Sequence, residues 1–222
     1  MDIIFFAALA FFIFFKLSKQ LGKIDEEEKK NIEEKLIQMR SIQEQVSAQM
    51  KQKEKIIGAS STQNKSEEKI LSEIDPAIKE SLLPILQRCN ISADFFVSGA
   101  KSAFEMVLKA FAGRDLEVLK FLLAENIFVG FEAAINQHKA EGTVVTTNLI
   151  SIDEAQILSA TMLENNALIT VKFVSKQINY ITKGEGNIIV GRKDEISEIT
   201  DVWTFKRDIN STNPNWIVSA TN

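Results

Sequence analysis

Cysteine, histidine and proline are scarce in this sequence, and its charge is not basic. The 222 residues include 1 Cys and 1 His, which excludes an internal disulfide framework and zinc sites built on several Cys or His ligands. With 9 Gly and 3 Pro, the chain is neither collagen-like nor of low complexity. The net charge of −4 argues against nucleic acid, because phosphate binding needs a concentrated excess of Lys and Arg. We expect no nucleic-acid partner, no metal site and no cofactor.

Phenylalanine, by contrast, is concentrated at the start of the chain. Of the 15 Phe, six fall within the first 15 residues, and no polar side chain occurs from Ile3 to Phe15. As a helix, residues 3–17 would span roughly 22 Å, short of the ~30 Å hydrocarbon core, and the stems of Lys16 and Lys19 would extend its reach to the headgroups. We predict that residues 1–19 form a transmembrane anchor. Its predicted membrane-spanning residues are Ile3, Phe5, Phe6, Leu9, Phe11, Phe12, Phe14 and Phe15.

A cleaved signal peptide is the alternative to this anchor. The first residues, Met1 and Asp2, carry no basic charge, and the apolar stretch is followed by LSKQLGKI rather than by a small-residue cleavage site, so an uncleaved anchor is favoured. Lys16, Lys19 and Lys23 follow the stretch. The positive-inside rule therefore predicts a single-pass protein of the inner (cytoplasmic) membrane with its bulk on the cytoplasmic side.

A charged segment and a polar segment follow the anchor. Residues 20–57 mix acidic and basic residues with a stripe of apolar residues at helical spacing, namely Ile32, Leu36, Met39, Ile42, Val46 and Met50. One narrow stripe cannot bury itself, so the stem is a solvated rod, lies on a membrane, or self-associates as a short coiled coil. Residues 58–69 have the Gly, Ser, Asn and Lys content of a flexible linker.

The remaining residues, 70–222, are expected to form one α+β domain. Helical periodicity comes first, with Asp75 and Asp115 as helix caps and Gly142 closing the last helix. Strand-like alternation follows, with a hairpin turn at residues 165–166. The helices are expected at 74–89, 92–112, 116–127 and 128–138, and the strands at 143–150, 155–163, 167–181, 188–190, 199–207 and 216–221. This order predicts helices packed on one face of a curved antiparallel sheet.

Several segments of this domain resemble a known family. They are FFVSGAKSAF at 95–104 with GRD at 113–115, the run from Gly191 to Ile199, DVWTFKRD at 201–208, NPNW at 213–216, and Ala220–Thr221. In their order and spacing they resemble the C-terminal domain of the Tim-forty-four-like family, the inner-membrane translocase subunit of mitochondria and its bacterial relatives. The resemblance covers about residues 70–222. It implies a fold similar to the nuclear-transport-factor-two and cystatin-like domains, with helices clasped by a bent sheet around an apolar pocket. It also implies a membrane-bound adaptor with lipid and translocation proteins as partners.

Two tryptophan motifs suggest where such a pocket would lie. Trp203 and Phe205 alternate with polar and aliphatic residues, so a strand places both rings on one face, and Trp216 in the last strand is expected to pack across from Trp203. These aromatics are either ordinary core or, with Phe173, the lining of a pocket for an acyl chain or an apolar peptide segment.

The polar residues near these motifs point to no catalytic group. Arg207 is expected to form surface ion pairs with Asp208 and Asp201. Cys89 ends an apolar helical run and is expected to be a small buried hydrophobe, and His138 to lie on the surface near a helix C-terminus.

Three functions are compatible with these patterns. The first is a membrane-anchored adaptor or tether for proteins of translocation or membrane-protein assembly, which is not an enzyme and has no catalytic residues. The second is a pocket-based enzyme, such as an isomerase or dehydratase, which needs a buried ionisable group, whereas Asp153, Glu198 and Asp201 are expected at solvated strand ends. The third is a lipid-binding or structural module, on the opposite side of the membrane or bound to a large assembly.

Overall fold

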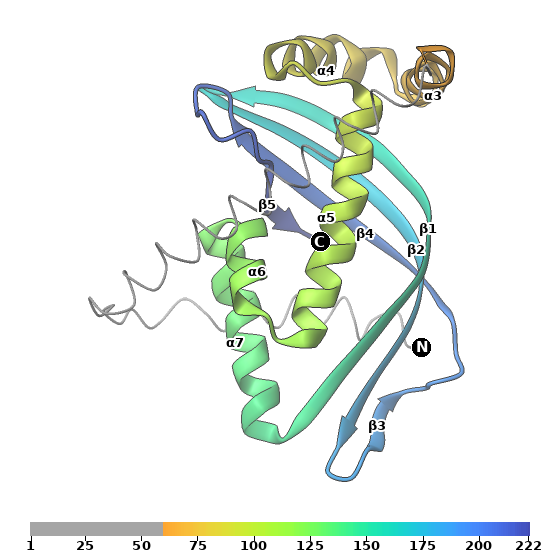
Figure 1. The fold of residues 1–222 in the computed structure, drawn as a ribbon, viewed down its shortest axis with the longest axis vertical. Helices are drawn as coiled ribbons and strands as arrows, with labels where there is room; N and C mark the ends of the chain where they lie inside the picture. The colour runs from red at the N-terminus through yellow and green to blue at the C-terminus, as the bar shows by residue number, and fades with distance from the viewer. Residues whose placement is uncertain (1–59) are drawn as a thin grey trace, which may run out of the picture. The chain divides into compact units, whose positions relative to one another are not determined.

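The computed structural model describes residues 60–222, with side chains from Glu67 onward. The predicted anchor (1–19) and stem (20–57) lie outside the described residues. The helices are α3 (Ser60–Glu73), α4 (Pro76–Cys89), α5 (Ala93–Gly113), α6 (Leu116–Leu122) and α7 (Glu125–Glu141). The strands are β1 (Thr143–Leu163), β2 (Asn166–Lys183), β3 (Asn187–Gly191), β4 (Ser197–Asp208) and β5 (Ile217–Thr221). Helices followed by strands confirm the α+β class (Figure 1).

The segment predicted as a flexible linker differs from that expectation. From Ser60 onward its residues belong to α3, so the part of the predicted flexible linker (58–69) that the structure describes is helical. No Pro or Gly occurs after Gly58 in this segment, so nothing in its backbone interrupts a helix. A Glu67 carboxylate oxygen accepts a hydrogen bond from the backbone N–H of Ala93, 3.2 Å away, which connects the middle of α3 to the start of α5.

The helix boundaries follow the predicted capping residues. Asp75 accepts a hydrogen bond from the N–H of Ala77 at 2.8 Å, and Asp115 accepts one from the N–H of Val118 at 3.1 Å, so each satisfies one free donor of its helix. Gly142 closes α7 in the left-handed conformation at φ 65°, as expected. α5 runs to Gly113, one residue beyond its predicted end, and Arg114 takes the left-handed cap position at φ 59°.

The strands form one antiparallel sheet in the order β1-β2-β4-β5, and β3 pairs with the far end of β2. Two separate strands were expected over 143–163, but β1 is a single strand of 21 residues. It is interrupted by register shifts at Ile150, Asp153 and Leu158. Each bulge shifts the side-chain alternation by one residue and so keeps apolar side chains on one face of a long, bent strand. The turn to β2 lies at residues 164–165, one residue earlier than expected.

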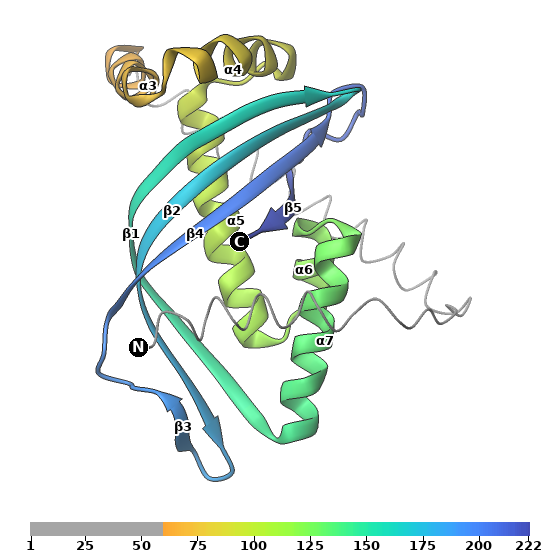
Figure 2. The same cartoon turned by 180° about the vertical axis from the view of Figure 1, so that it is seen from behind.

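The helices pack on the concave face of this sheet. α5 runs along the inside of the curve with α6 and α7 beside it (Figures 1 and 2), and both α4 and α5 contact β1. Helix and sheet share one core, which includes Leu82, Phe104, Val107, Leu119, Ile135, Ile169, Val171 and Val218. The convex face has ion pairs: Lys172 pairs with Glu154 at 3.0 Å and Lys176 with Asp153 at 2.7 Å. The helices that the structure describes lack the combination of length and apolar character needed to cross a bilayer.

Two glycines provide a matched test of the edge of the sheet. Gly191 ends β3 at φ 73°, and a Cβ there would collide with the carbonyl oxygen of Asn179 in β2. Gly191→Ala should therefore destabilise this edge by about 1–3 kcal/mol and speed hydrogen exchange of the β3 amides. Gly99→Ala in α5, whose Cβ meets nothing within 4 Å, should instead stabilise by about 0.5–1 kcal/mol. Equal exchange of the β3 amides in the two variants would contradict the pairing of β3 with β2.

Candidate functional site

The predicted aromatic residues come together on the concave face of the sheet. Trp203 and Phe205 in β4 both point inward and are buried, which confirms the predicted alternation. Phe173 in β2 is fully buried on the same face, and its ring lies 6.0 Å from Trp203 and 6.4 Å from Phe205 between centroids, edge-on to both. The three rings form one aromatic surface across two neighbouring strands.

Two phenylalanines of α5 cover this surface. Phe104 stacks on Phe173 with 4.6 Å between ring centroids and also contacts Trp203 at 4.7 Å. Phe96 meets Phe205 edge-on at 5.9 Å. Such pairs contribute about 0.5–1.5 kcal/mol each beyond the area that they bury. The predicted pocket residues thus share one face, and that face is packed against the domain's own helix; binding of a ligand by them stays a prediction.

Trp216 lies elsewhere than expected. It directly precedes β5, and its ring packs edge-on against Phe96 at 5.0 Å. Packing across from Trp203 is wrong, because the antiparallel register places Thr221 opposite Trp203. Trp216 therefore lies near the start of α5, several residues along the sheet from Trp203.

Asp201 is an acidic residue on this face. It is opposite Phe173 in the sheet register and two residues before Trp203, so it shares the inward phase of the aromatics. Burial raises the pKa of the Asp201 carboxyl to about 6, and a hydrogen bond from the Trp203 side chain lowers it in part. The expectation that Asp201 is solvated at a strand end is wrong. Its inward position was available from the sequence, because Asp201, Trp203 and Phe205 follow one strand alternation. Asp153 and Glu198 are exposed, as expected.

A row of polar side chains continues along β2 beside Asp201. Ser175 and Gln177 are buried, and the Gln177 amide donates to the Ser175 hydroxyl at 2.8 Å. The Asn179 amide in turn donates to the Gln177 carbonyl oxygen at 3.1 Å. These hydrogen bonds satisfy polar groups that burial would otherwise leave unpaired. The concave face is therefore aromatic over one part and polar over the next, with Asp201 where the two parts meet.

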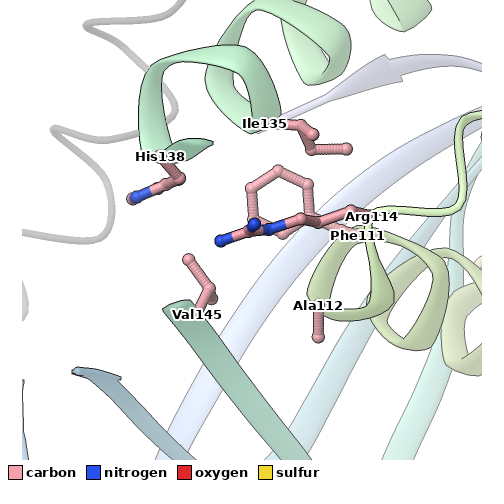
Figure 3. Close-up of a pocket in the computed structure, with 6 residues that line it drawn as sticks. All are labelled: Phe111, Ala112, Arg114, Ile135, His138 and Val145. Atoms are coloured by element: carbon pink, nitrogen blue, oxygen red, sulfur yellow. The ribbon is translucent and has the colours of Figure 1, made fainter. Parts of the chain in front are cut away.

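A small hollow lies between the end of α5, α7 and the start of β1 (Figure 3). It is lined by Phe111, Ala112, Arg114, Ile135, His138 and Val145 and leaves no room for a water molecule. His138 lies in the last turn of α7, near the helix C-terminus as expected, but it is partly buried and its Nδ1 lies 2.9 Å from the Thr143 hydroxyl. Burial is the main cause that lowers the pKa of His138, which Glu141 raises and Arg114 lowers further. Arg114 also donates a hydrogen bond to the Thr143 carbonyl oxygen. These contacts connect the ends of α5 and α7 to the start of β1.

Arg207 does not form the predicted surface ion pairs. Its side chain is half-buried on the concave side, and its Nη1 donates to the carbonyl oxygen of Cys89 at 3.4 Å. No ion pair of Arg207 with Asp208 or Asp201 occurs in residues 67–222. The ion-pair expectation is wrong because strand alternation turns Arg207 inward, like Phe205 two residues before it. Cys89 is buried, as expected.

The geometry defines a class of protein: an α+β domain whose helices fill the concave face of a curved sheet with aromatic side chains. Among the described residues, no three His, Cys, Asp or Glu side chains gather in a metal-binding arrangement. Residues 89–222, more than half of the chain, match the Tim44-like domain. The chain belongs to the Tim44-like domain family, in agreement with the resemblance of its motifs.

Relatives of known name support this assignment. The chain is 24% identical over 109 residues to a probable mitochondrial import inner membrane translocase subunit of Caenorhabditis elegans, covering 49% of this chain and 26% of that protein. It is 23% identical over 141 residues to mitochondrial import inner membrane translocase subunit TIM44-1 of Arabidopsis thaliana, covering 63% of this chain and 29% of that protein. It therefore spans less than a third of the length of these two relatives.

Two further similarities concern a bacterial protein and a solved structure. An uncharacterized protein of Rickettsia prowazekii is 24% identical over 223 residues, which cover 98% of this chain and 95% of that protein. The intermembrane space region of the chloroplast protein ARC6 aligns with a TM-score of 0.39 and 10% identity, over 55% of this chain and 92% of that chain.

The aromatic contact between α5 and the sheet can be tested with two phenylalanines of the same helix. Phe104 is fully buried, so Phe104→Ala should lower the free energy of unfolding by about 3–5 kcal/mol. Phe95 is 55% exposed, and Phe95→Ala should change it by less than about 0.5 kcal/mol. Urea unfolding followed by near-UV circular dichroism measures both. Similar losses in the two variants would contradict the assignment of Phe104 to the core.

Asp201 should make stability depend on pH in a defined direction. Because the pKa is raised in the folded state, the native protein holds more protons than the unfolded chain between about pH 4 and 6, and stability falls as the pH rises through that window. Asp201→Asn should therefore match the parent chain near pH 4 and exceed its stability at pH 7.5 by on the order of 3 kcal/mol.

Urea unfolding at the two pH values measures this difference. The control is Asp153→Asn on the convex face, where a hydrogen bond from Lys176 lowers the pKa of the carboxyl. That variant should show no gain in stability at pH 7.5. A gain there equal to that of Asp201→Asn would assign the effect to net charge rather than to burial.

Proposed function

We propose that this protein is a membrane-anchored adaptor whose α+β domain binds protein partners of translocation or membrane-protein assembly. The observation that carries the proposal is the Tim44-like domain over residues 89–222. Two relatives that share this region are named as subunits of the mitochondrial import inner membrane translocase. We assign this chain to a related task, with its domain as the part that contacts partners.

The packing of the domain favours contacts on its outside. The aromatic concave face is covered by Phe96 and Phe104 of the domain's own helix. Large apolar side chains are nevertheless exposed on the helices, namely Leu83 on α4, Phe95 and Met106 on α5, Phe121 on α6 and Val129 on α7, and others are exposed on the strands and loops. Exposed apolar side chains are a common feature of surfaces that bind other proteins. Of these surfaces, we place partner binding on the helix layer, where α5, α6 and α7 each expose a large apolar side chain.

Membrane attachment in this proposal comes from residues 1–19. The apolar run from Ile3 to Phe15 would hold the chain in the inner membrane as a single-pass protein, with its domain on the cytoplasmic side. Attachment through a stem of residues 20–57 would raise the local concentration of the domain at the membrane, so weak contacts would suffice for recruitment. Self-association through the stem as a coiled coil and contacts with membrane lipid belong to the same proposal.

We further propose that the domain is not an enzyme. Its inward carboxyl, Asp201, owes its raised pKa to burial and is hydrogen-bonded to Trp203. A general acid or base must lie within hydrogen-bond reach of the proton that it transfers, whereas the neighbours of Asp201 on this face are aromatic rings and a row of polar side chains that hydrogen-bond to one another. This arrangement supports a role for Asp201 in the core.

Membrane retention and crosslinking test the adaptor function together. The full chain and a variant lacking residues 1–19 are expressed in cells with a photo-crosslinking amino acid at position 95. The full chain should resist alkaline carbonate extraction and crosslink to membrane-embedded translocation subunits, and the shortened chain should be extracted and lose at least tenfold in crosslinking.

The matched control carries the crosslinker at Glu198, an exposed position on β4. Crosslinks to the same subunits from positions 95 and 198 in equal yield would contradict partner binding by the helix layer. Release of the full chain by carbonate would contradict the anchor.

A further inference from the structure

Two hydrogen-bond donors lie side by side where β4 ends and β5 begins. The last registered pair of these strands is Lys206 with Ile217, and continuing that register by one residue places Arg207 of β4 opposite Trp216, which directly precedes β5. Both turn to the concave side: Arg207 reaches the end of α4 at Cys89, and Trp216 packs on Phe96 at the start of α5. Opposite residues of neighbouring strands have Cβ atoms about 5 Å apart, within reach of one shared ligand.

Each of these side chains keeps a buried donor without a partner. The Nε of Arg207 and the Nε1 of Trp216 are both inaccessible to solvent and make no hydrogen bond in the described structure. They are the two buried side-chain atoms in this state among residues 67–222. A buried donor that loses its hydrogen bond to water and gains no other costs about 1–3 kcal/mol. Two such donors close together therefore indicate a site for a hydrogen-bond acceptor.

The charge of Arg207 narrows the nature of that acceptor. In the described residues the guanidinium has one hydrogen bond, from Nη1 to the neutral carbonyl oxygen of Cys89. It forms no ion pair there with a carboxylate. The guanidinium is half-buried, so its charge is only partly solvated, and a water molecule at its buried Nε would satisfy the donor without supplying an opposite charge. The site therefore favours an anion.

The shape of the donors favours a carboxylate over a phosphate. With Nη1 occupied, the edge of the guanidinium that contains Nε is free, and this edge pairs with the two oxygens of a planar carboxylate. The surroundings are apolar, with the rings of Phe96 and Phe205 close by. One negative charge matches one guanidinium, whereas a doubly charged phosphate would bring a second charge that no further group compensates.

We propose that Arg207 and Trp216 form a binding site for a single carboxylate group, held by the guanidinium Nε edge and the indole N–H beneath the α4–α5 junction. A small organic acid and an acidic peptide side chain both supply this group. The site lies at the opposite end of the aromatic cluster from Asp201, and it is independent of the proposed anchor and partner surface.

The two tryptophans of the chain allow a direct test. In the full 222-residue chain labelled with ¹⁵N-tryptophan, two indole N–H signals are expected, and Trp216→Phe assigns them. Acetate, titrated against chloride at constant ionic strength, should shift the Trp216 signal to saturation. The Trp203 signal should stay in place, because its side chain already bonds to Asp201.

Arg207→Gln should weaken the acetate response of Trp216 at least tenfold while leaving the Trp203 signal unchanged, which shows that the fold is intact. A second titration uses a blocked pentapeptide with one central Glu. If this peptide binds more tightly than acetate, the carboxylate comes from an acidic peptide side chain. If it binds more weakly, the carboxylate comes from a small organic acid. The proposal is overturned if acetate does not shift the Trp216 signal, or if it shifts this signal equally in Arg207→Gln and in the parent chain. If inorganic phosphate shifts the Trp216 signal as strongly as acetate or more so, the site binds phosphate, and the carboxylate proposal is overturned.

Discussion

The contact between α5 and the concave face of the sheet is the interaction on which the rest of the domain depends. Phe104 joins β2 and β4 by contacting Phe173 and Trp203 at once, and Phe96 joins β4 to the start of β5 by contacting Phe205 and Trp216. A curved sheet without this helix would expose a row of aromatic rings to water. Helix and sheet are therefore stable only together, since each supplies the apolar surface that the other must bury.

The curvature that allows this contact comes from β1. Its register shifts at Ile150, Asp153 and Leu158 bend a strand that is too long to follow the sheet as a regular ribbon. At its start, Thr143 is fastened to the helix layer by hydrogen bonds with Arg114 and His138. The helices are thus connected to the sheet at that end by polar contacts and along its length by aromatic ones.

Ionisable groups occupy the two ends of the aromatic cluster. Asp201 lies toward the polar row of β2, where burial raises the pKa of its carboxyl, and Arg207 lies beneath the end of α4. Aromatic side chains of the domain fill the space between these two groups.

Local patterns in the sequence determined the α+β class, the caps at Asp75 and Asp115, the inward alternation of Trp203 and Phe205, and the family motifs. These features depend on neighbours within a few residues, so periodicity and composition reveal them. The tertiary structure alone decided that β1 is continuous, that Trp216 packs on Phe96 rather than opposite Trp203, and that Arg207 meets the carbonyl of Cys89. Such contacts depend on strand register and on the bulges that shift it. They join residues more than a hundred positions apart, so no local sequence pattern reveals them.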